Sequence, residues 1–275
     1  DAEALAEAMR YVFSHSQEMP VITQAAKARF DCLFGYRGAE LVKQVYMRIF
    51  RLYHGARTCG LCGARYFESR EFSTPGFSVV ACTLCGLVQV TPIPDSRMLA
   101  QAYGAEYYKT WVTTQRDRRV RMWERRMNRI ERLVPSRGRL LDVGCADGSF
   151  LAIAHRHGWD ISGTEVSSAG AALARGLVGE GVFCQELSQA QFPDNAFDVV
   201  TLWHVLEHVP DPLQLLYEIR RVLKPGGSLF VAAPNLENTL YRWAYRLARG
   251  KRTHLFDPRD RELHLYHFSV ATLTQ

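Results

Sequence analysis

Leu140–Leu151 reads LLDVGCADGSFL, and this stretch is the strongest indication of the fold. A short apolar run ends at Val143, and a turn bracketed by Gly144 and Gly148 follows it directly. The residues after the turn open a helical pattern, so the stretch predicts a strand, a tight turn and a helix. Glycines in such a turn let the backbone pass close to a ligand, because they carry no side chain.

Short apolar runs continue to alternate with helical patterns downstream of this turn. The runs are RLLDVG, ISGTEV, GVFCQ, FDVVTLW and SLFVAAP. Strands separated by helices form βαβ units, which build a parallel sheet. We therefore expect residues 139–275 to form one α/β domain on a mainly parallel sheet.

The turn differs from the phosphate-binding turns of other α/β proteins. Its pattern is Gly144-x-Ala146-x-Gly148, which lacks the spacing of a dinucleotide-binding turn, and nothing resembles a P-loop lysine. Asp142 lies two residues ahead of the turn, and Glu165 ends the second apolar run. A carboxylate at that strand end is able to accept two hydrogen bonds from a ribose diol. The turn and the acid together predict a site for a nucleoside-containing cofactor.

Four of the seven cysteines form two CxxC pairs separated by nineteen residues: Cys59, Cys62, Cys82 and Cys85. A glycine follows the second cysteine of each pair, where the chain must turn sharply. Two such turns are able to enclose Zn²⁺ tetrahedrally, and four protein ligands make the predicted zinc structural rather than catalytic. A pair of turns without metal and a redox dithiol are the alternatives. The clustered, odd cysteine count favours a reducing compartment.

Composition is ordinary for a soluble globular protein, with 47% apolar and 23% charged residues in 275. No apolar run reaches the roughly 18 residues that span a bilayer. The N-terminus lacks the pattern of a signal peptide, and we expect a cytoplasmic protein. Much of the net charge of +6 comes from residues 116–132. Because acidic residues are interleaved there, a solvated helix face is expected, with polyanion binding as the alternative.

The chain is expected to have four parts. Residues 1–56 form a helical segment whose apolar positions recur at helical spacing in AELVKQVYMRIFRLY. We expect this segment to pack on the rest of the chain, on a second copy in a homodimer or on a partner protein, with a membrane-surface helix as the alternative. Residues 57–92 form the four-cysteine zinc ribbon, and 93–138 form a helical linker or lid before the domain at 139–275.

Residues 139–235 resemble the core of class I S-adenosylmethionine-dependent methyltransferases. The motifs that carry the resemblance are LLDVGCADGSFL, GTEVS, CQELSQ, FPDNAFDVVTLWHVLEHVPDP and VLKPGGSLFVAAPN, with Ala146 where many members have glycine. FSVVACTLCGLVQVTPIPDSRMLAQAYGAEYY is similar to the zinc ribbon and linker of many bacterial methyltransferases of this group. Many of those are encoded with glycan or secondary-metabolite pathways. HLYHFSVATL is similar to the substrate-side segment of the same enzymes.

The resemblance implies a Rossmann-like, doubly wound sheet that binds S-adenosyl-L-methionine. The glycine-rich turn would approach the methionine moiety, Glu165 would bind the ribose hydroxyls, and Glu186 with Leu187 would flank the adenine. The family's sheet normally ends with an antiparallel strand pair, which we expect to be missing before Gln275. The full set implied for cofactor binding is Asp142, Gly144, Ala146, Gly148, Glu165, Val166, Glu186, Leu187 and Trp203.

Leu202–Pro212, LWHVLEHVPDP, contains H-x-x-E-H, the inverted zinc-peptidase signature. That signature needs a helix, whereas here a predicted strand runs into it and prolines follow, so a peptidase is excluded. Three roles remain open: His204 is a general base, His204 with Glu207 and His208 holds a divalent cation, or His208 and Glu207 cap the turn and are structural. An imidazole in place of a carboxylate speaks against Mg²⁺ in the cation role.

His264 and His267 are further candidates for acceptor-side chemistry, so the catalytic candidates are His204, His208, His264 and His267. The expected activity is methyl transfer to an oxygen or nitrogen of a small-molecule, sugar or glycan-related acceptor. One alternative is an RNA or protein methyltransferase whose ribbon reads the macromolecule, although the ribbon lacks dense basic and aromatic residues. Another is a non-catalytic cofactor-binding scaffold.

Overall fold

The structure is a computed structural model that describes residues 58–74, 77–94, 98–99, 116–238, 255–256, 260 and 262–274. The chain divides into two compact units, Asp1–Ala56 and Arg57–Gln275, and all described residues belong to the second. The N-terminal segment that is expected to be helical, residues 1–56, lies outside the described residues. Most of the expected linker before Arg116 lies outside them as well.

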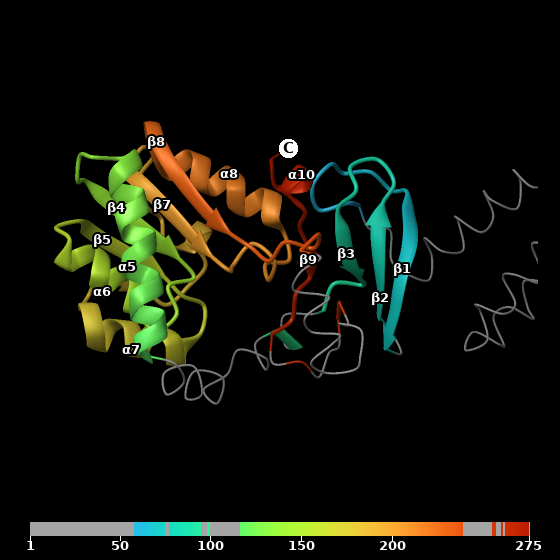
Figure 1. Cartoon of the computed structure of the whole chain (residues 1–275), viewed down its shortest axis with the longest axis horizontal. Helices are drawn as coiled ribbons and strands as arrows, with labels where there is room; N and C mark the ends of the chain where they lie inside the picture. Colours follow the sequence, from blue (N-terminus) through green and yellow to red (C-terminus); the bar gives the residue numbers. More distant parts are fainter. Residues whose placement is uncertain are drawn as a thin grey trace, which may run out of the picture. The chain divides into compact units, whose positions relative to one another are not determined.

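A five-stranded parallel sheet forms the centre of residues 139–232, in the order β6-β5-β4-β7-β8 (Figure 1). The strands are β4 (Arg139–Val143), β5 (Asp160–Thr164), β6 (Val182–Phe183), β7 (Phe197–Trp203) and β8 (Leu223–Ala232). The prediction of a Rossmann-like parallel sheet is confirmed. Strand order reverses between β4 and β7, so the carboxyl ends of these two strands border the crevice where such sheets bind ligands.

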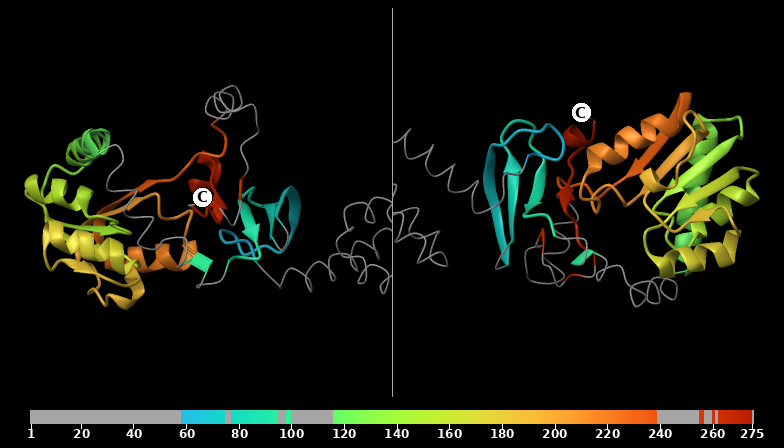
Figure 2. Two further views of the ribbon diagram at one scale, coloured as in Figure 1. Left: turned by 90° about the horizontal axis from the view of Figure 1, so that it is seen from below. Right: turned by 180° about the vertical axis from the view of Figure 1, so that it is seen from behind.

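Helices cover both faces of this sheet, because right-handed crossovers on the two sides of the reversal lie on opposite faces. Figure 2 shows α8 on the side of the sheet opposite α5. The helices are α5 (Arg116–Leu133), α6 (Ser149–Arg156), α7 (Ser168–Val178) and α8 (Pro212–Val222), with a 3₁₀ turn η2 (Leu187–Gln189). No helix in the described part of the chain has both the length and the apolar character needed to cross a bilayer.

The apolar side of α5 explains why this arginine-rich helix is ordered on the sheet. Trp123, Met127 and Ile130 recur at helical spacing and are buried with Leu140 of β4 and Phe150 of α6. Full burial of an apolar side chain of this size stabilises the fold by about 1.5–3 kcal/mol. Arg125 and Arg129 of the same helix are exposed, as expected for an amphipathic helix, whereas Arg126 is half-buried.

The cysteine ribbon forms a second, antiparallel sheet in the order β1-β2-β3-β9. Its strands are β1 (Phe67–Thr74), β2 (Phe77–Cys82), β3 (Val88–Thr91) and β9 (Tyr266–His267), and α10 (Val270–Leu273) follows β9. Figure 1 shows β9 beside β3. The last strand of the ribbon sheet therefore comes from the C-terminal end of the chain, a pairing that local sequence patterns did not predict.

The ribbon shares a hydrophobic core with the α8 side of the large sheet. Val79 and Leu87 of the ribbon belong to the same buried cluster as Phe197, Leu202 and Leu265. Among the described residues, no further strand joins the five-stranded sheet beyond β8, which is its edge. The ribbon and the large sheet are thus parts of one packed unit.

Candidate functional site

The glycine-rich turn after β4 adopts the backbone that its sequence predicts. Gly144, Ala146 and Gly148 have φ values of 71°, 50° and 74°, all in the left-handed region. A Cβ on Gly144 would lie 2.6 Å from Cγ2 of Val205, and one on Gly148 would lie 2.9 Å from the Cα of Ala174. Both positions exclude a side chain by backbone conformation and by space, so the turn holds the backbone at the mouth of the crevice.

Glu165 anchors this turn from the end of β5. Its Oε2 accepts the Ala146 N–H at 3.0 Å and its Oε1 accepts the Ser167 N–H at 2.8 Å. Each carboxylate oxygen has two lone pairs, so it is able to accept more than one hydrogen bond. Next to it, Val166 is 64% exposed and open to a ligand. Ribose binding by Glu165 stays a prediction.

Asp142 lies beneath the turn, buried inside the sheet. Thr201 Oγ1 donates a hydrogen bond of 2.6 Å to its Oδ1. Burial, with a smaller contribution from the charge of Glu165, raises the pKa of Asp142 to about 7. Asp142 is therefore a structural acid behind the ligand surface, and contact with a cofactor there stays a prediction.

Arg126 of α5 is the site residue that sequence reasoning missed. Its guanidinium lies over the rings of Trp123 and Trp203, with 4.8 and 4.5 Å to the ring centroids. Its Nη2 is 3.4 Å from Nε2 of His204, while its buried Nη1 has no hydrogen-bond partner. The available signal was Trp123 and Arg126 one turn apart on a helix preceding the glycine-rich turn. An unpartnered buried guanidinium nitrogen at this edge fits an anionic group of a ligand.

Trp203 and His204 emerge at the carboxyl end of β7, as predicted. His204 has φ 59°, and the chain then turns without forming a helix, which confirms that the peptidase signature lacks its structural context. The Nδ1 of His204 lies 3.3 Å from Oε1 of Glu207, and 49% of the His204 side chain is exposed. His204 is thus oriented by a carboxylate and accessible from the crevice.

Glu207 is the buried centre of a histidine cluster. Its side chain is 1% exposed, and its Oε2 has no hydrogen-bond partner. His208 lies with Nε2 3.9 Å from Oε1 of Glu207, and its Nδ1 is 2.9 Å from the carbonyl oxygen of Leu263. An Nδ1–H that donates to this carbonyl leaves Nε2 with its lone pair facing the carboxylate.

The second pair of histidines completes this cluster. The ring of His264 lies 4.8 Å from that of His208, and the ring of His267 lies 6.2 Å from His264. Burial lowers the pKa of both, that of His267 to about 4, so both are neutral at pH 7. His267 Nε2 is buried without a partner, which shows that this histidine is not a solvated surface residue.

A divalent cation held by His204, Glu207 and His208 was one of the three open roles, and the ligand atoms that converge in the structure are a different set. Among the described residues, the ligand atoms of Glu207, His208 and His264 all lie within 4.8 Å of one another. His264 therefore replaces His204 in this set, because the C-terminal segment returns against Glu207 while His204 points towards Arg126. Sequence spacing alone could not place a residue that is distant along the chain.

The four cysteines of the ribbon converge as their spacing predicts. Cys59 Sγ lies 3.5 Å from that of Cys85, Cys62 Sγ lies 3.6 Å from that of Cys82, and all four sulfurs lie within 4.8 Å. Four sulfurs around zinc at about 2.3 Å would be about 3.8 Å apart. The donor set and its spacing fit a structural zinc ion.

Glu186 and Leu187 occupy the turn after β6. Leu187 is 3% exposed, whereas Glu186 is exposed at the start of η2. An apolar side chain next to an exposed carboxylate suits one edge of an adenine pocket. Their adenine role stays a prediction.

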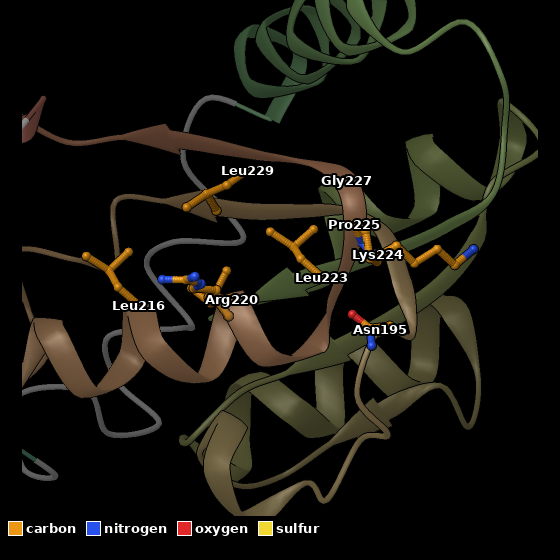
Figure 3. A pocket seen from close by; sticks show the side chains of 9 residues that line it. Asn195, Leu216, Arg220, Leu223, Lys224, Pro225, Gly227 and Leu229 are labelled. Carbon is orange, nitrogen blue, oxygen red and sulfur yellow. The ribbon is translucent and has the colours of Figure 1, made fainter.

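A hollow of about 450 Å³ lies away from these residues, at the amino end of β8 (Figure 3). Ligands of open parallel sheets bind at the carboxyl ends of the strands, so this hollow is not the expected cofactor site. None of the predicted site residues lines it. Its lining is Asn195, Leu216, Ile219, Arg220, Leu223, Lys224, Pro225, Gly227 and Leu229.

The chain is similar to one known protein family and to several known proteins. The profile of a family described as "Methyltransferase domain" matches residues 114–273. The ubiquinone biosynthesis O-methyltransferase of Coxiella burnetii (strain RSA 493 / Nine Mile phase I) is 29% identical over 116 residues, 40% of this chain and 50% of that protein. Its counterpart from Pseudomonas aeruginosa (strain UCBPP-PA14) is 31% identical over 112 residues, 38% of this chain and 48% of that protein.

The chain thus spans about half the length of the curated relatives it matches. Among solved structures, the PH0226 protein from Pyrococcus horikoshii OT3 is 26% identical, with a TM-score of 0.43. That match covers 53% of this chain and 69% of the other.

Proposed function

The chain belongs to the methyltransferase domain family, and we propose that it transfers a methyl group from S-adenosylmethionine to an oxygen of a small-molecule, sugar or glycan-related acceptor. The observation that carries the proposal is the convergence of the glycine-rich turn, Arg126 and the Glu207–His204 pair at the carboxyl ends of β4 and β7. The relatives are ubiquinone biosynthesis O-methyltransferases, and their O-methylation supports an oxygen acceptor.

The residues present fit the cofactor. The unpartnered Nη1 of Arg126 is suited to the carboxylate of its amino-acid end, and the carboxylate of Glu165 is suited to its ribose. The left-handed turn at Gly144 and Gly148 lets backbone atoms approach without a side chain between them. Val166 is exposed beside Glu165 and would contact the adenine.

When bound, the cofactor supplies a sulfonium that already activates the methyl group, so the protein mainly orients the reactants and excludes water. His204 holds its Nδ1–H towards Glu207 and its Nε2 lone pair towards Arg126. If the carboxylate of the cofactor's amino-acid end binds Arg126, the Nε2 of His204 would be free for the hydroxyl group of the methyl acceptor. His204 Nε2 would then be placed to accept the hydroxyl proton of the acceptor, and that oxygen would receive the activated methyl group that the cofactor supplies. The buried carboxylate of Glu207 stabilises the resulting imidazolium.

A divalent transition-metal ion at Glu207, His208 and His264 is a second role for the same cluster. The unpartnered Glu207 Oε2 favours it, because a buried carboxylate oxygen without a donor is costly. Two imidazoles and one carboxylate suit Zn²⁺, Fe²⁺ or Mn²⁺ more than Mg²⁺. Metal analysis of the purified chain decides this role: loss of a non-zinc metal, or of a second zinc, in His264→Gln supports it, and an unchanged metal content contradicts it.

The ribbon is proposed to hold one structural zinc ion on its four cysteines. Because thiolates must stay reduced to bind zinc, a reducing compartment such as the cytoplasm follows as part of the proposal. Macromolecular substrates remain the rival proposal, supported by the exposed arginines of α5.

Incubation with methyl-labelled S-adenosylmethionine and a fractionated lysate tests the function. We expect label in small molecules or glycans, and its loss in His204→Ala with cofactor binding retained. Label confined to RNA or protein would overturn the small-molecule acceptor. Cofactor binding without transfer to any fraction would indicate a scaffold.

A further inference from the structure

The segment 263–267, which carries two of the four clustered histidines, belongs to the ribbon sheet on one side. Gln89 pairs with Tyr266 and Val88 pairs with His267 in antiparallel register. The Val90 N–H also donates to the carbonyl oxygen of Leu265 at 2.8 Å. The backbone of β3 therefore fixes where this segment lies.

The same segment is bonded to the loop after β7 on its other side. The N–H groups of Leu265 and Tyr266 both donate to the carbonyl oxygen of Glu207, at 2.7 and 3.2 Å. The hydroxyl of Tyr266 donates to the carbonyl oxygen of Pro210 at 2.9 Å. Together with the bond between His208 Nδ1 and the Leu263 carbonyl, these contacts tie the loop to a strand of the ribbon.

The first CxxC turn, Cys59–Cys62, which we call the first cysteine knuckle, packs directly against Tyr266. A Cβ placed on Gly60 would lie 2.5 Å from Cε1 of the Tyr266 ring, and that ring is 3% exposed. The Gly60 N–H donates to Oε1 of Gln89 at 3.1 Å, and Gln89 is the strand residue that pairs with Tyr266. Gly60 lies between the ligand positions Cys59 and Cys62, so the conformation of the knuckle is transmitted to the ring.

From these contacts we infer that the cysteine ribbon positions the acceptor-side histidines, and that Tyr266 is the positioning residue through which it acts. The first cysteine knuckle and β3 contact Tyr266 and fix its position. Tyr266 in turn donates hydrogen bonds to the backbone oxygens of Glu207 and Pro210. His208 and His264 lie around the Glu207 side chain that is positioned in this way. This role requires no contact between the ribbon and a macromolecular substrate. The effect of this positioning on turnover rests on the proposed function, whereas the contacts between the ribbon and the histidine cluster do not depend on it.

The test uses the zinc-loaded full chain and two variants that keep all four cysteines. Gly60→Ala places a methyl group against the Tyr266 ring, and Tyr266→Phe removes only the hydroxyl that reaches Pro210. Leu84→Ala is the matched control, because Leu84 lies in the second cysteine knuckle, Cys82–Cys85, and its side chain is exposed (74%). The readouts are zinc content, affinity for S-adenosylhomocysteine, and the imidazole resonances of His208 and His264, assigned with His208→Gln and His264→Gln.

We expect Gly60→Ala and Tyr266→Phe to shift these imidazole resonances while zinc content and cofactor-product affinity stay at the wild-type values. Leu84→Ala should shift neither resonance. On an identified acceptor, kcat should fall about 10- to 100-fold in both variants, because small misplacements of reacting groups have effects of that size. The KM for S-adenosylmethionine should not change.

Wild-type resonances in Tyr266→Phe with bound zinc would overturn the inference. If Gly60→Ala does not fold, Tyr266→Phe supplies the same readout. Failure of the proposed methyl transfer would appear instead as an inactive wild type whose resonances still respond to these changes.

Discussion

Glu207 Oε1 lies 3.3 Å from His204 Nδ1, and this carboxylate is buried while the imidazole that it orients is half exposed. With its Nδ1 facing this buried carboxylate, His204 would carry its proton on Nδ1 and keep the lone pair of Nε2 for the proposed proton transfer. The pair joins a residue of the core to one at the rim of the crevice.

Replacing Glu207 with Gln should lower kcat about 100-fold or more without changing the affinity for S-adenosylhomocysteine. The amide keeps the shape but loses the charge that stabilises the imidazolium. Steady-state kinetics and calorimetric titration measure the two effects. Glu218→Gln is the control, since Glu218 pairs with Arg221 on α8. An unchanged kcat in Glu207→Gln would show that His204 does not depend on this carboxylate.

Replacing Arg126 with Met should weaken the binding of S-adenosylhomocysteine about 10- to 100-fold. The change removes a charged donor with a buried, unpartnered nitrogen while keeping an apolar chain over the two tryptophan rings. Isothermal titration calorimetry measures the affinity. Arg125→Met, an exposed neighbour on α5, is the matched control. Equal affinities in the two variants would exclude Arg126 from the cofactor site.

Asp142 should make the protein less stable as the pH rises from about 4 to about 7. Its pKa is raised to about 7 by burial, whereas an unfolded aspartate titrates near 4. Between these values the unfolded chain loses a proton that the folded chain keeps, so up to about 4 kcal/mol of stability present at low pH is lost. Asp142→Asn lacks this titration, and urea unfolding of both proteins across the range measures the difference. Parallel curves would contradict the raised pKa.

Gly148→Ala should destabilise the fold by about 1–3 kcal/mol. The new Cβ would lie 2.9 Å from the Cα of Ala174 on a backbone with φ 74°. Ala146→Gly is the contrasting variant, because Ala146 already has φ 50° and glycine relieves strain there, by up to about 1 kcal/mol. Urea unfolding gives both changes in free energy. Equal stability of the two variants would contradict the packing of the turn on α7.

Cys62→Ser should reduce the bound zinc below one ion per chain and destabilise the ribbon. Its sulfur is one of four that lie within 4.8 Å of one another, and the loss of one thiolate would leave the proposed zinc site with three protein ligands. Cys184→Ser, at another exposed free cysteine outside the ribbon, should keep its zinc. Metal analysis by mass spectrometry compares them. Equal zinc contents would assign the metal elsewhere.

Much of the fold follows from local patterns. The five apolar runs became β4 to β8, and Gly144 and Gly148 of the turn after β4 have the left-handed backbone that glycine readily adopts. Strand periodicity, glycine positions and CxxC spacing are properties of a few consecutive residues. Because such signals do not depend on distant contacts, the parallel sheet and the cysteine knuckles were predictable from them.

The composition of the histidine cluster was decided by tertiary structure. His264 reaches Glu207 because β9 pairs with the ribbon, and Arg126 reaches His204 because the apolar side of α5 is buried. Each contact joins residues that are far apart in the chain, and its geometry depends on how separate elements pack.

Local sequence patterns are sufficient to place the strands, the glycine-rich turn and the four cysteines. Which charged groups face one another depends on packing, because burial and the pairing of distant segments are properties of the folded molecule alone.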